Sequence, residues 1–431
     1  MLDWRRLLIS DVFQHTTVAF IDRLLLSLTH FIIGIFLLRR ASTADYGLYV
    51  LAQGAMLLVF FVQSALITVP MSVLAPKYST EAKRYFVSAL MQGQYVIWLP
   101  LSALVALCTL ALYRCGGLAA DSTHMILVVD LVLLAVLLRE FIRYAFYVYL
   151  RPGAVLCVDA IYGSVTIAAA YVVTATSAAP ALHTLIGIGL ANLMAGVFGF
   201  VLFHRYVGWR ATWTTTALAR TLEHGKWALL GASVTWLQTE GFLYLLGALK
   251  GTSEVASVSA SRLLLMPIIL LTSSFEAIVK PRGAAWLASG ERHKLEQSIT
   301  LLTGVALAIS GLYMIGILLV GERLAAFVFE ANVTGMRLLL GLWGVVLLCK
   351  ICSANLNIVL QILERFDILF YIGLVSAAVS VTFGYGAIQQ FGAPGSLLGL
   401  IVVEVVGLAG MGTWLYKRQQ FTFAMPTLRK V

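Results

Sequence analysis

Eight ionisable residues lie deep inside long apolar stretches of this sequence, where they could bind an ion or a charged substrate. Such side chains cost several kcal/mol in a membrane unless they face protein or water. A set this large favours a polar interior that handles a transported species, and some members could instead form structural ion pairs. The eight residues are Asp22, Arg23, Asp130, Asp159, Glu240, Arg262, Lys350 and Glu404.

The basic members of this set suit an anionic substrate. Arg23, Arg262 and Lys350 come from the first, eighth and tenth apolar stretches. A guanidinium group binds phosphate oxygens through two hydrogen bonds and keeps its proton, which suits a pyrophosphate. We expect the three side chains to meet in a central cavity. Arg139 and Arg143, four residues apart, either guide an anionic head group inward or extend to lipid head groups, and the second interpretation is favoured. Arg143 remains a substrate-binding candidate.

The acidic members are candidates for ion coupling. Asp22, Asp130, Asp159 and Glu240 lie where a carboxylate could bind and release H⁺ or Na⁺ during a transport cycle. Glu240 lies nearest the middle of its stretch. We expect no cofactor beyond such an ion, because the sequence has no P-loop and its histidines lack the spacing of a zinc site.

The composition is that of a polytopic α-helical membrane protein. The 431 residues are 60% hydrophobic and 12% charged, with a mean hydropathy of +0.92, whereas a soluble domain has roughly 25% charged residues. The net charge of +10 does not indicate nucleic-acid binding, because the basic residues lie in short loops. Five cysteines, mostly inside the apolar stretches, give no disulfide framework.

The apolar stretches predict about twelve membrane-spanning helices. Most of the 30 Lys and Arg residues lie at the two termini and in the even-numbered loops, so both termini are expected in the cytoplasm. The predicted spans are Thr16–Leu38, Tyr46–Ala75, Tyr85–Tyr113, Thr123–Leu150, Ala154–Ser177, Leu182–His204, Lys226–Leu249, Glu254–Val279, Ile299–Val320, Val333–Leu363, Phe366–Gln389 and Pro394–Tyr416.

The sequence also suggests two related halves. Arg39, Ser42 and Pro70 align with Lys250, Ser253 and Pro281 at one constant offset, within the same pattern of apolar run, turn and apolar run. Duplication of this kind is typical of transporters. We predict an N-terminal six-helix lobe at 1–205, a cytoplasmic linker at 206–225 and a C-terminal six-helix lobe at 226–431. The linker, rich in Trp and Arg, is either an interfacial helix or an ordinary basic loop.

The first hairpin resembles a known family. The segment 37–51, Leu-Leu-Arg-Arg-Ala-Ser-Thr-Ala-Asp-Tyr-Gly-Leu-Tyr-Val-Leu, is similar to the first-hairpin signature of the polysaccharide transporter family. Those flippases share a superfamily with the multidrug and toxin extrusion (MATE) proteins and the lipid II flippases. Relatives carry Arg in the first, second and eighth spans. Arg23 and Arg262 match the first and eighth, but the second span has Gln53 and Gln63 and no Arg.

The resemblance implies a MATE-like fold and a flippase of undecaprenyl-pyrophosphate-linked oligosaccharide for O-antigen, capsule or exopolysaccharide synthesis. It further implies ion-coupled alternating access, a bacterial inner-membrane location, contact with membrane lipids, and a polysaccharide polymerase and export machinery as partners.

Two other functions stay open. A multidrug or cation antiporter of the same superfamily would use the acidic residues. A membrane-bound glycan polymerase or ligase is disfavoured, because such enzymes generally carry a large periplasmic loop and no outward loop here is long enough.

Overall fold

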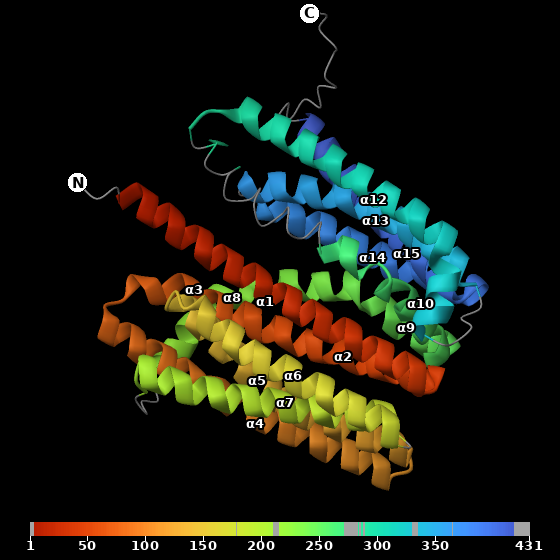
Figure 1. The fold of residues 1–431 in the computed structure, drawn as a ribbon, viewed down its shortest axis with the longest axis horizontal. Coiled ribbons are helices and arrows are strands. Elements are labelled where there is room, and N and C mark those ends of the chain that lie inside the picture. Colours follow the sequence, from red (N-terminus) through yellow and green to blue (C-terminus); the bar gives the residue numbers. More distant parts are fainter. Residues whose placement is uncertain are drawn as a thin grey trace, which may run out of the picture. The chain divides into compact units, whose positions relative to one another are not determined.

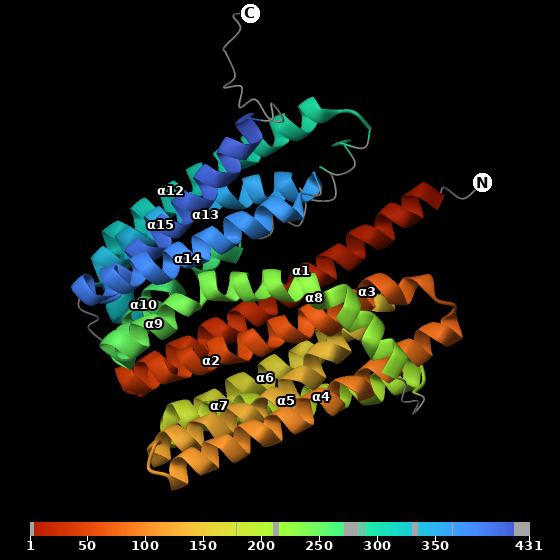
Figure 2. The same ribbon diagram turned by 180° about the vertical axis from the view of Figure 1, so that it is seen from behind.

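The computed structural model describes residues 4–177, 179–209, 215–270, 283, 286–287, 289–329, 335–363 and 365–417. Its regular structure over these residues is entirely helical (Figures 1 and 2). The chain divides into two compact units, Met1–Trp236 and Leu237–Val431. The expected all-α polytopic membrane architecture is therefore confirmed. The predicted division into lobes at 1–205 and 226–431 with a linker at 206–225 remains a prediction.

In the first unit, α6 lies between α1 and α7, and α5 packs against both α7 and α4 (Figure 1). Close packing of α7 on α5 depends on glycine, because a Cβ atom on Gly189 would lie 2.7 Å from Val132 and one on Gly196 would lie 2.9 Å from Leu138. The elements are α1 (Trp4–Arg40), α2 (Thr43–Gln63), the π-helix η1 (Ser64–Thr68), α3 (Val69–Leu74), the 3₁₀ helix η2 (Ala75–Lys77), α4 (Thr80–Arg114), α5 (Ala120–Val148), α6 (Pro152–Thr176), α7 (Pro180–Tyr206) and α8 (Thr215–Thr239).

The second unit is a bundle in which α15 packs between α13 and α14, and α12 packs on α13 (Figure 2). Its core includes Leu295 and Ile299 of α12, Val359 of α13 and Leu415 of α15, all essentially buried. The elements are α9 (Gly241–Lys250), α10 (Thr252–Leu263), α12 (Arg292–Phe329), α13 (Met336–Ile362), α14 (Phe366–Phe391) and α15 (Ala393–Lys417).

Polar residues in the turn of the first hairpin stabilise the start of α2. Ser42 is the N-cap of α2: its Oγ accepts a hydrogen bond from the Asp45 backbone N–H at 3.1 Å and donates one to Asp45 Oδ2 at 2.8 Å. The carboxylate of Asp45 also lies in the first turn, where the helix dipole favours negative charge. Ser42 and Asp45 together therefore stabilise the start of α2.

Nine stretches among the described residues are long and apolar enough to cross a membrane, and they cover the predicted spans one, two, three, five, six and nine to twelve. The fourth predicted span is α5, a single helix with several charged residues. The seventh is interrupted at Glu240, between α8 and α9. The eighth begins as α10, turns at 264–265 just before Pro267, and continues beyond 270 outside the described residues.

Candidate functional site

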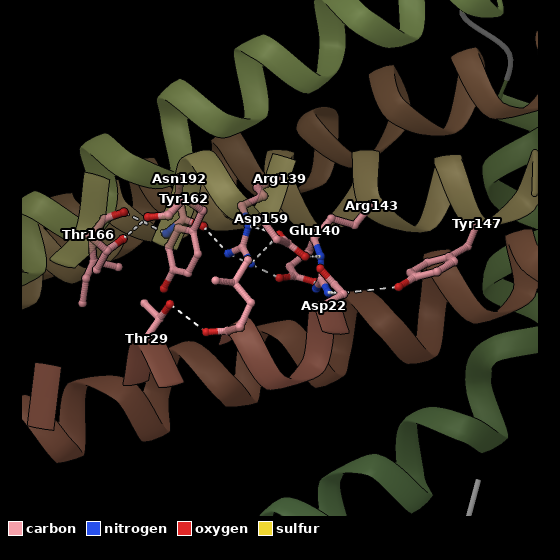
Figure 3. A network of polar contacts seen from close by, with 12 residues as sticks. Asp22, Thr29, Arg139, Glu140, Arg143, Tyr147, Asp159, Tyr162, Thr166 and Asn192 are labelled. Atoms are coloured by element: carbon pink, nitrogen blue, oxygen red, sulfur yellow. Dashed lines mark hydrogen bonds and ion pairs between the residues drawn. The ribbon is translucent and has the colours of Figure 1, made fainter. Parts of the chain in front are cut away.

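Three helices of the first unit bring a set of charged side chains together in its interior (Figure 3). The set, called here the buried charge cluster, consists of Asp22 on α1, Arg139, Glu140 and Arg143 on α5, and Asp159 on α6. Positions 139 and 143 lie on one face of α5 because residues four apart are neighbours on a helix. The packing of α6 on both α1 and α7 then places Asp159 within reach.

Asp159 is the central acceptor. Its side chain is 0% exposed, and each of its oxygens binds a different guanidinium group. Oδ1 accepts from Arg139 Nε at 3.0 Å, and Oδ2 accepts from Arg143 Nε at 2.6 Å. Such charge-assisted bonds are about twice as strong as neutral ones. One carboxylate therefore holds both arginines of α5.

Arg143 joins the three acidic side chains of the cluster. Besides its bond to Asp159, its Nη1 donates to Glu140 Oε2 at 2.7 Å and its Nη2 donates to Asp22 Oδ2 at 3.2 Å. The hydroxyl of Tyr147 lies 3.4 Å from the same Asp22 oxygen. Arg143 thus connects α1 to α5 and α6.

Arg139 is held by neutral groups as well as by Asp159. Its Nη1 donates to Asn192 Oδ1 at 2.9 Å, and its guanidinium carbon lies 3.7 Å from the centre of the Tyr162 ring. The amide of Asn192 is in turn fixed by a bond to the Ile188 carbonyl at 2.8 Å. The planar guanidinium is therefore bonded at its edge and stacked on its face.

The cluster has an unbalanced charge. It contains three carboxylates and two guanidinium groups, so one negative charge is in excess when all five are ionised. Asp22 is 1% exposed, and its Oδ1 is buried without a hydrogen-bond donor among the described residues. A buried acceptor without a partner is costly. A proton or a monovalent cation on this oxygen would remove both the excess charge and the missing bond.

The structure corrects one interpretation and separates one candidate from the others. Arg139 and Arg143 do not extend to lipid head groups, because Arg139 is only 4% exposed and both are held by Asp159. Asp130 is also on α5, but it is two and a half turns before Arg139 and accepts a bond from Ser102 of α4 at 2.7 Å. Arg23 follows Asp22 on α1 and is exposed.

The second unit holds the other candidates. Glu240 lies at the break between α8 and α9, where its buried carboxylate lies 3.3 Å from Arg262 Nη1 of α10. The Arg262 side chain is 38% exposed, and Lys350 of α13 is exposed. Glu404 of α15 accepts a bond from Ser353 of α13 at 2.5 Å. Carboxylates at broken helices are typical of ion sites in transporters.

Gln63 takes part in a buried amide network of the first unit. Its Nε2 donates to Gln94 Oε1 and to the Leu137 carbonyl, both at 2.8 Å. Gln63 is the last residue of α2, directly before the π-helix η1. The position thus binds α2 to α4 and α5.

Solved structures provide the comparison with known proteins. One similar structure is the lipid II flippase MurJ in an inward closed conformation, with a TM-score of 0.72, 12% identity and coverage of 95% of this chain and 88% of that chain. Another is an inward-facing multidrug resistance MATE family transporter of the MOP superfamily, with a TM-score of 0.70, 14% identity and coverage of 92% and 96%. The chain has the fold of these transporters. A MOP superfamily transporter from Pyrococcus furiosus, described as having a binding pocket of reverse polarity, also shares this fold (TM-score 0.63, 13% identity, 95% of each chain). No family model and no curated protein sequence matches the chain.

Sequence reasoning missed four residues in and around the cluster: Glu140, Asn192, Tyr147 and Tyr162. Glu140 could have been found from its three-residue spacing to Arg143, and Asn192 as an amide inside an apolar run. Among the described residues, no group of three or more His, Cys, Asp or Glu side chains is arranged to hold a metal ion.

Proposed function

We propose that this protein is a transporter, and specifically a flippase that moves a lipid-linked oligosaccharide with an anionic pyrophosphate head group across the membrane. The observation that carries the proposal is the exposure of basic side chains well inside the predicted membrane spans. Arg23 and Lys350 are exposed, and Arg262 is partly so. A cation facing lipid tails at such depth is costly, so these groups are better placed in contact with water or an anionic ligand.

The substrate class has two independent supports. Guanidinium groups bind phosphate oxygens bidentately, so Arg23 and Arg262 suit a pyrophosphate better than a cationic drug. The sequence at residues 37–51 resembles the polysaccharide transporter family, and MurJ, which shares the fold, is a lipid II flippase. In this proposal Arg143 serves the cluster rather than the substrate.

The buried charge cluster is proposed to couple transport to an ion gradient. Its excess negative charge and the unpartnered Asp22 Oδ1 favour reversible loading of H⁺. Two arginines among three carboxylates disfavour Na⁺, because each guanidinium repels a second cation at short distance. Glu240 and Asp130 are secondary candidates for ion coupling. Glu240 already has a donor in Arg262, and Asp130 already has one in Ser102.

A multidrug antiporter is the second candidate function. Like MurJ, the MATE transporters share the fold of this chain. The excess negative charge of the cluster would serve H⁺-coupled drug export. The exposed basic residues argue against a cationic substrate. These two functions differ in the phenotype of a deletion.

The test is export of surface polysaccharide in a deletion strain complemented with wild type, Arg23→Ala, Arg262→Ala or, as a matched control, Arg365→Ala. Arg365 lies in the loop between α13 and α14, where its guanidinium group pairs with Asp367 at 2.7 Å and lies 4.7 Å from the centre of the Trp414 ring. We expect either of the first two substitutions to abolish export and to accumulate lipid-linked repeat units on the cytoplasmic side, while the control exports normally at matched membrane levels. Normal export by both variants contradicts the flippase. Intact surface glycan with increased drug sensitivity in the deletion strain favours the antiporter.

A further inference from the structure

A groove of about 430 Å³ lies at one end of the first unit, between the start of α4 and the start of α8. Its walls are mostly aromatic and small side chains, and its lining includes Tyr78, Ala82, Tyr85, Phe86, Thr216 and Arg220. The volume is within the range of pockets that hold small ligands. Neither the buried charge cluster nor the exposed basic residues of the spans contribute to it.

The polar groups of the groove select an anion. Arg220 is the charged residue of the lining, and its Nη1 donates to the Tyr78 hydroxyl oxygen at 2.9 Å. Because that oxygen accepts the hydrogen bond, the phenol O–H of Tyr78 points away from Arg220 and can itself act as a donor. Arg220 is exposed, and a guanidinium has further N–H donors in the same plane. Among the residues that the structure describes, the lining contains no carboxylate.

Neighbouring basic residues fix the walls of the groove instead of binding a ligand. Lys83 Nζ donates to the Val148 carbonyl at the end of α5 at 2.8 Å, and Arg84 Nη1 lies 3.4 Å from the Val207 carbonyl after α7. Both bonds satisfy carbonyls that a helix end leaves without partners. They hold the first turns of α4 against α5 and α7, which leaves Arg220 to supply the charge.

The groove is expected at the level where a membrane helix meets the head-group region. Tyr78 to Phe86 include the first two turns of α4, a helix of 35 residues that is long enough to cross the bilayer. At this level the protein is surrounded by lipid head groups. Anionic head groups are attracted to basic grooves between membrane helices. Tyr and Phe side chains with one basic group complement an amphiphile that has a negative head and an apolar body.

We propose that this groove is a binding site for an anionic phospholipid. The phosphodiester accepts hydrogen bonds from Arg220 and Tyr78, and the glycerol and first methylene groups lie on Phe86 and Ala82. Because the lipid contacts both α4 and the first turns of α8, it holds the start of α8 against the first unit. This site is separate from the proposed transport substrate and does not depend on it.

The test is native mass spectrometry of the full-length protein in detergent with added phosphatidylglycerol or phosphatidylcholine. We expect wild type to retain phosphatidylglycerol preferentially and Arg220→Gln to bind it about tenfold more weakly, as loss of one charge-assisted contact implies. Tyr78→Phe keeps the ring, removes the donor and should weaken binding several-fold. Arg205→Gln is the matched control, because Arg205 is exposed at the end of α7 but does not line the groove.

Three outcomes overturn the site. The first is equal retention of the two lipids by wild type. The second is Arg220→Gln binding phosphatidylglycerol as wild type does. The third is Arg205→Gln losing as much binding as Arg220→Gln, which would indicate general attraction to a basic face. Near-ultraviolet circular dichroism of each variant establishes that a loss of lipid is not a loss of fold.

Discussion

Asp159 and Asp22 have different surroundings in the buried charge cluster, and this difference predicts different phenotypes for one and the same substitution. Asp159 uses both oxygens to bind guanidinium groups, so Asp159→Asn leaves two buried arginines short of a counter-charge. Removal of one partner from a buried ion pair costs about 3–5 kcal/mol. Asp22→Asn removes the excess negative charge and keeps an amide oxygen for Arg143. We expect the Asp159→Asn variant to unfold at a much lower temperature than wild type. We expect the Asp22→Asn variant to fold normally but to lose ion-coupled export.

Thermal unfolding in detergent and the export assay, applied to both variants, separate these roles. Asp130→Asn is the control for the melting temperature, because it changes a buried carboxylate outside the cluster that accepts a hydrogen bond from the Ser102 hydroxyl. Normal export by Asp22→Asn would exclude Asp22 as the coupling residue. An unchanged melting temperature for Asp159→Asn would mean that the two arginines find other partners.

Sequence reasoning found four members of this cluster and could not join them all: Asp22, Arg139, Arg143 and Asp159. Asp22, Arg143 and Asp159 stand out as charges in apolar runs, because burial of a charge is expensive wherever it occurs. Their convergence depends on how α1, α5, α6 and α7 pack, which hydropathy does not encode. The sequence therefore suggested Arg143 as a substrate ligand. In the structure its N–H groups donate to Glu140, Asp159 and Asp22.

At the scale of helices, α8 contacts both η1 and α2, and these contacts give another prediction. A Cβ atom on Gly225 would lie 2.4 Å from the Ala65 carbonyl oxygen and 2.8 Å from Leu66 Cα, within the π-helix η1. Three turns later, Trp236 Nε1 donates to the Gly54 carbonyl at 2.8 Å. Backbone atoms cannot yield as a side chain does, so Gly225→Ala must displace α8 from η1. We expect a loss of about 1–3 kcal/mol in unfolding free energy.

The matched control lies on the same helix. A Cβ atom on Gly231 meets nothing within 4 Å, so Gly231→Ala should be neutral or stabilise α8 by up to about 1 kcal/mol through helix propensity. Denaturant unfolding of the two variants in one detergent compares them directly. Equal effects at both positions would mean that Gly225 does not mark a close crossing.

Helix positions followed from the sequence better than helix interruptions did. Apolar length predicted the continuous spans. The break at Glu240 and the π-helix after Gln63 were not predicted, because each forms where tertiary contacts outweigh local preference. Glu240 faces Arg262, and Gln63 donates to Gln94 and to the Leu137 carbonyl.

At the scale of the whole molecule, the distribution of Lys and Arg predicts which side of the membrane each loop faces. The helix α4 offers the sharpest test, because its 35 residues span roughly 50 Å and its two ends must lie outside a hydrocarbon core of about 30 Å. Cys115, the C-cap of α4, is an exposed free cysteine in a loop expected to face outward. Ser79, the exposed N-cap, lies in a loop expected to face the cytoplasm and makes no capping hydrogen bond.

Cysteine labelling in intact cells decides the orientation with these two positions. A variant that retains Cys115 and carries Ser at the other four cysteines should react with a membrane-impermeant maleimide without permeabilisation. Ser79→Cys, placed in a background with all five native cysteines replaced, should react only after the membrane is opened, because a charged reagent does not cross the bilayer. The reverse pattern would place both termini outside and invert the direction of the proposed transport. Labelling of both positions in intact cells would mean that α4 does not cross the membrane, which would contradict the whole arrangement of spans.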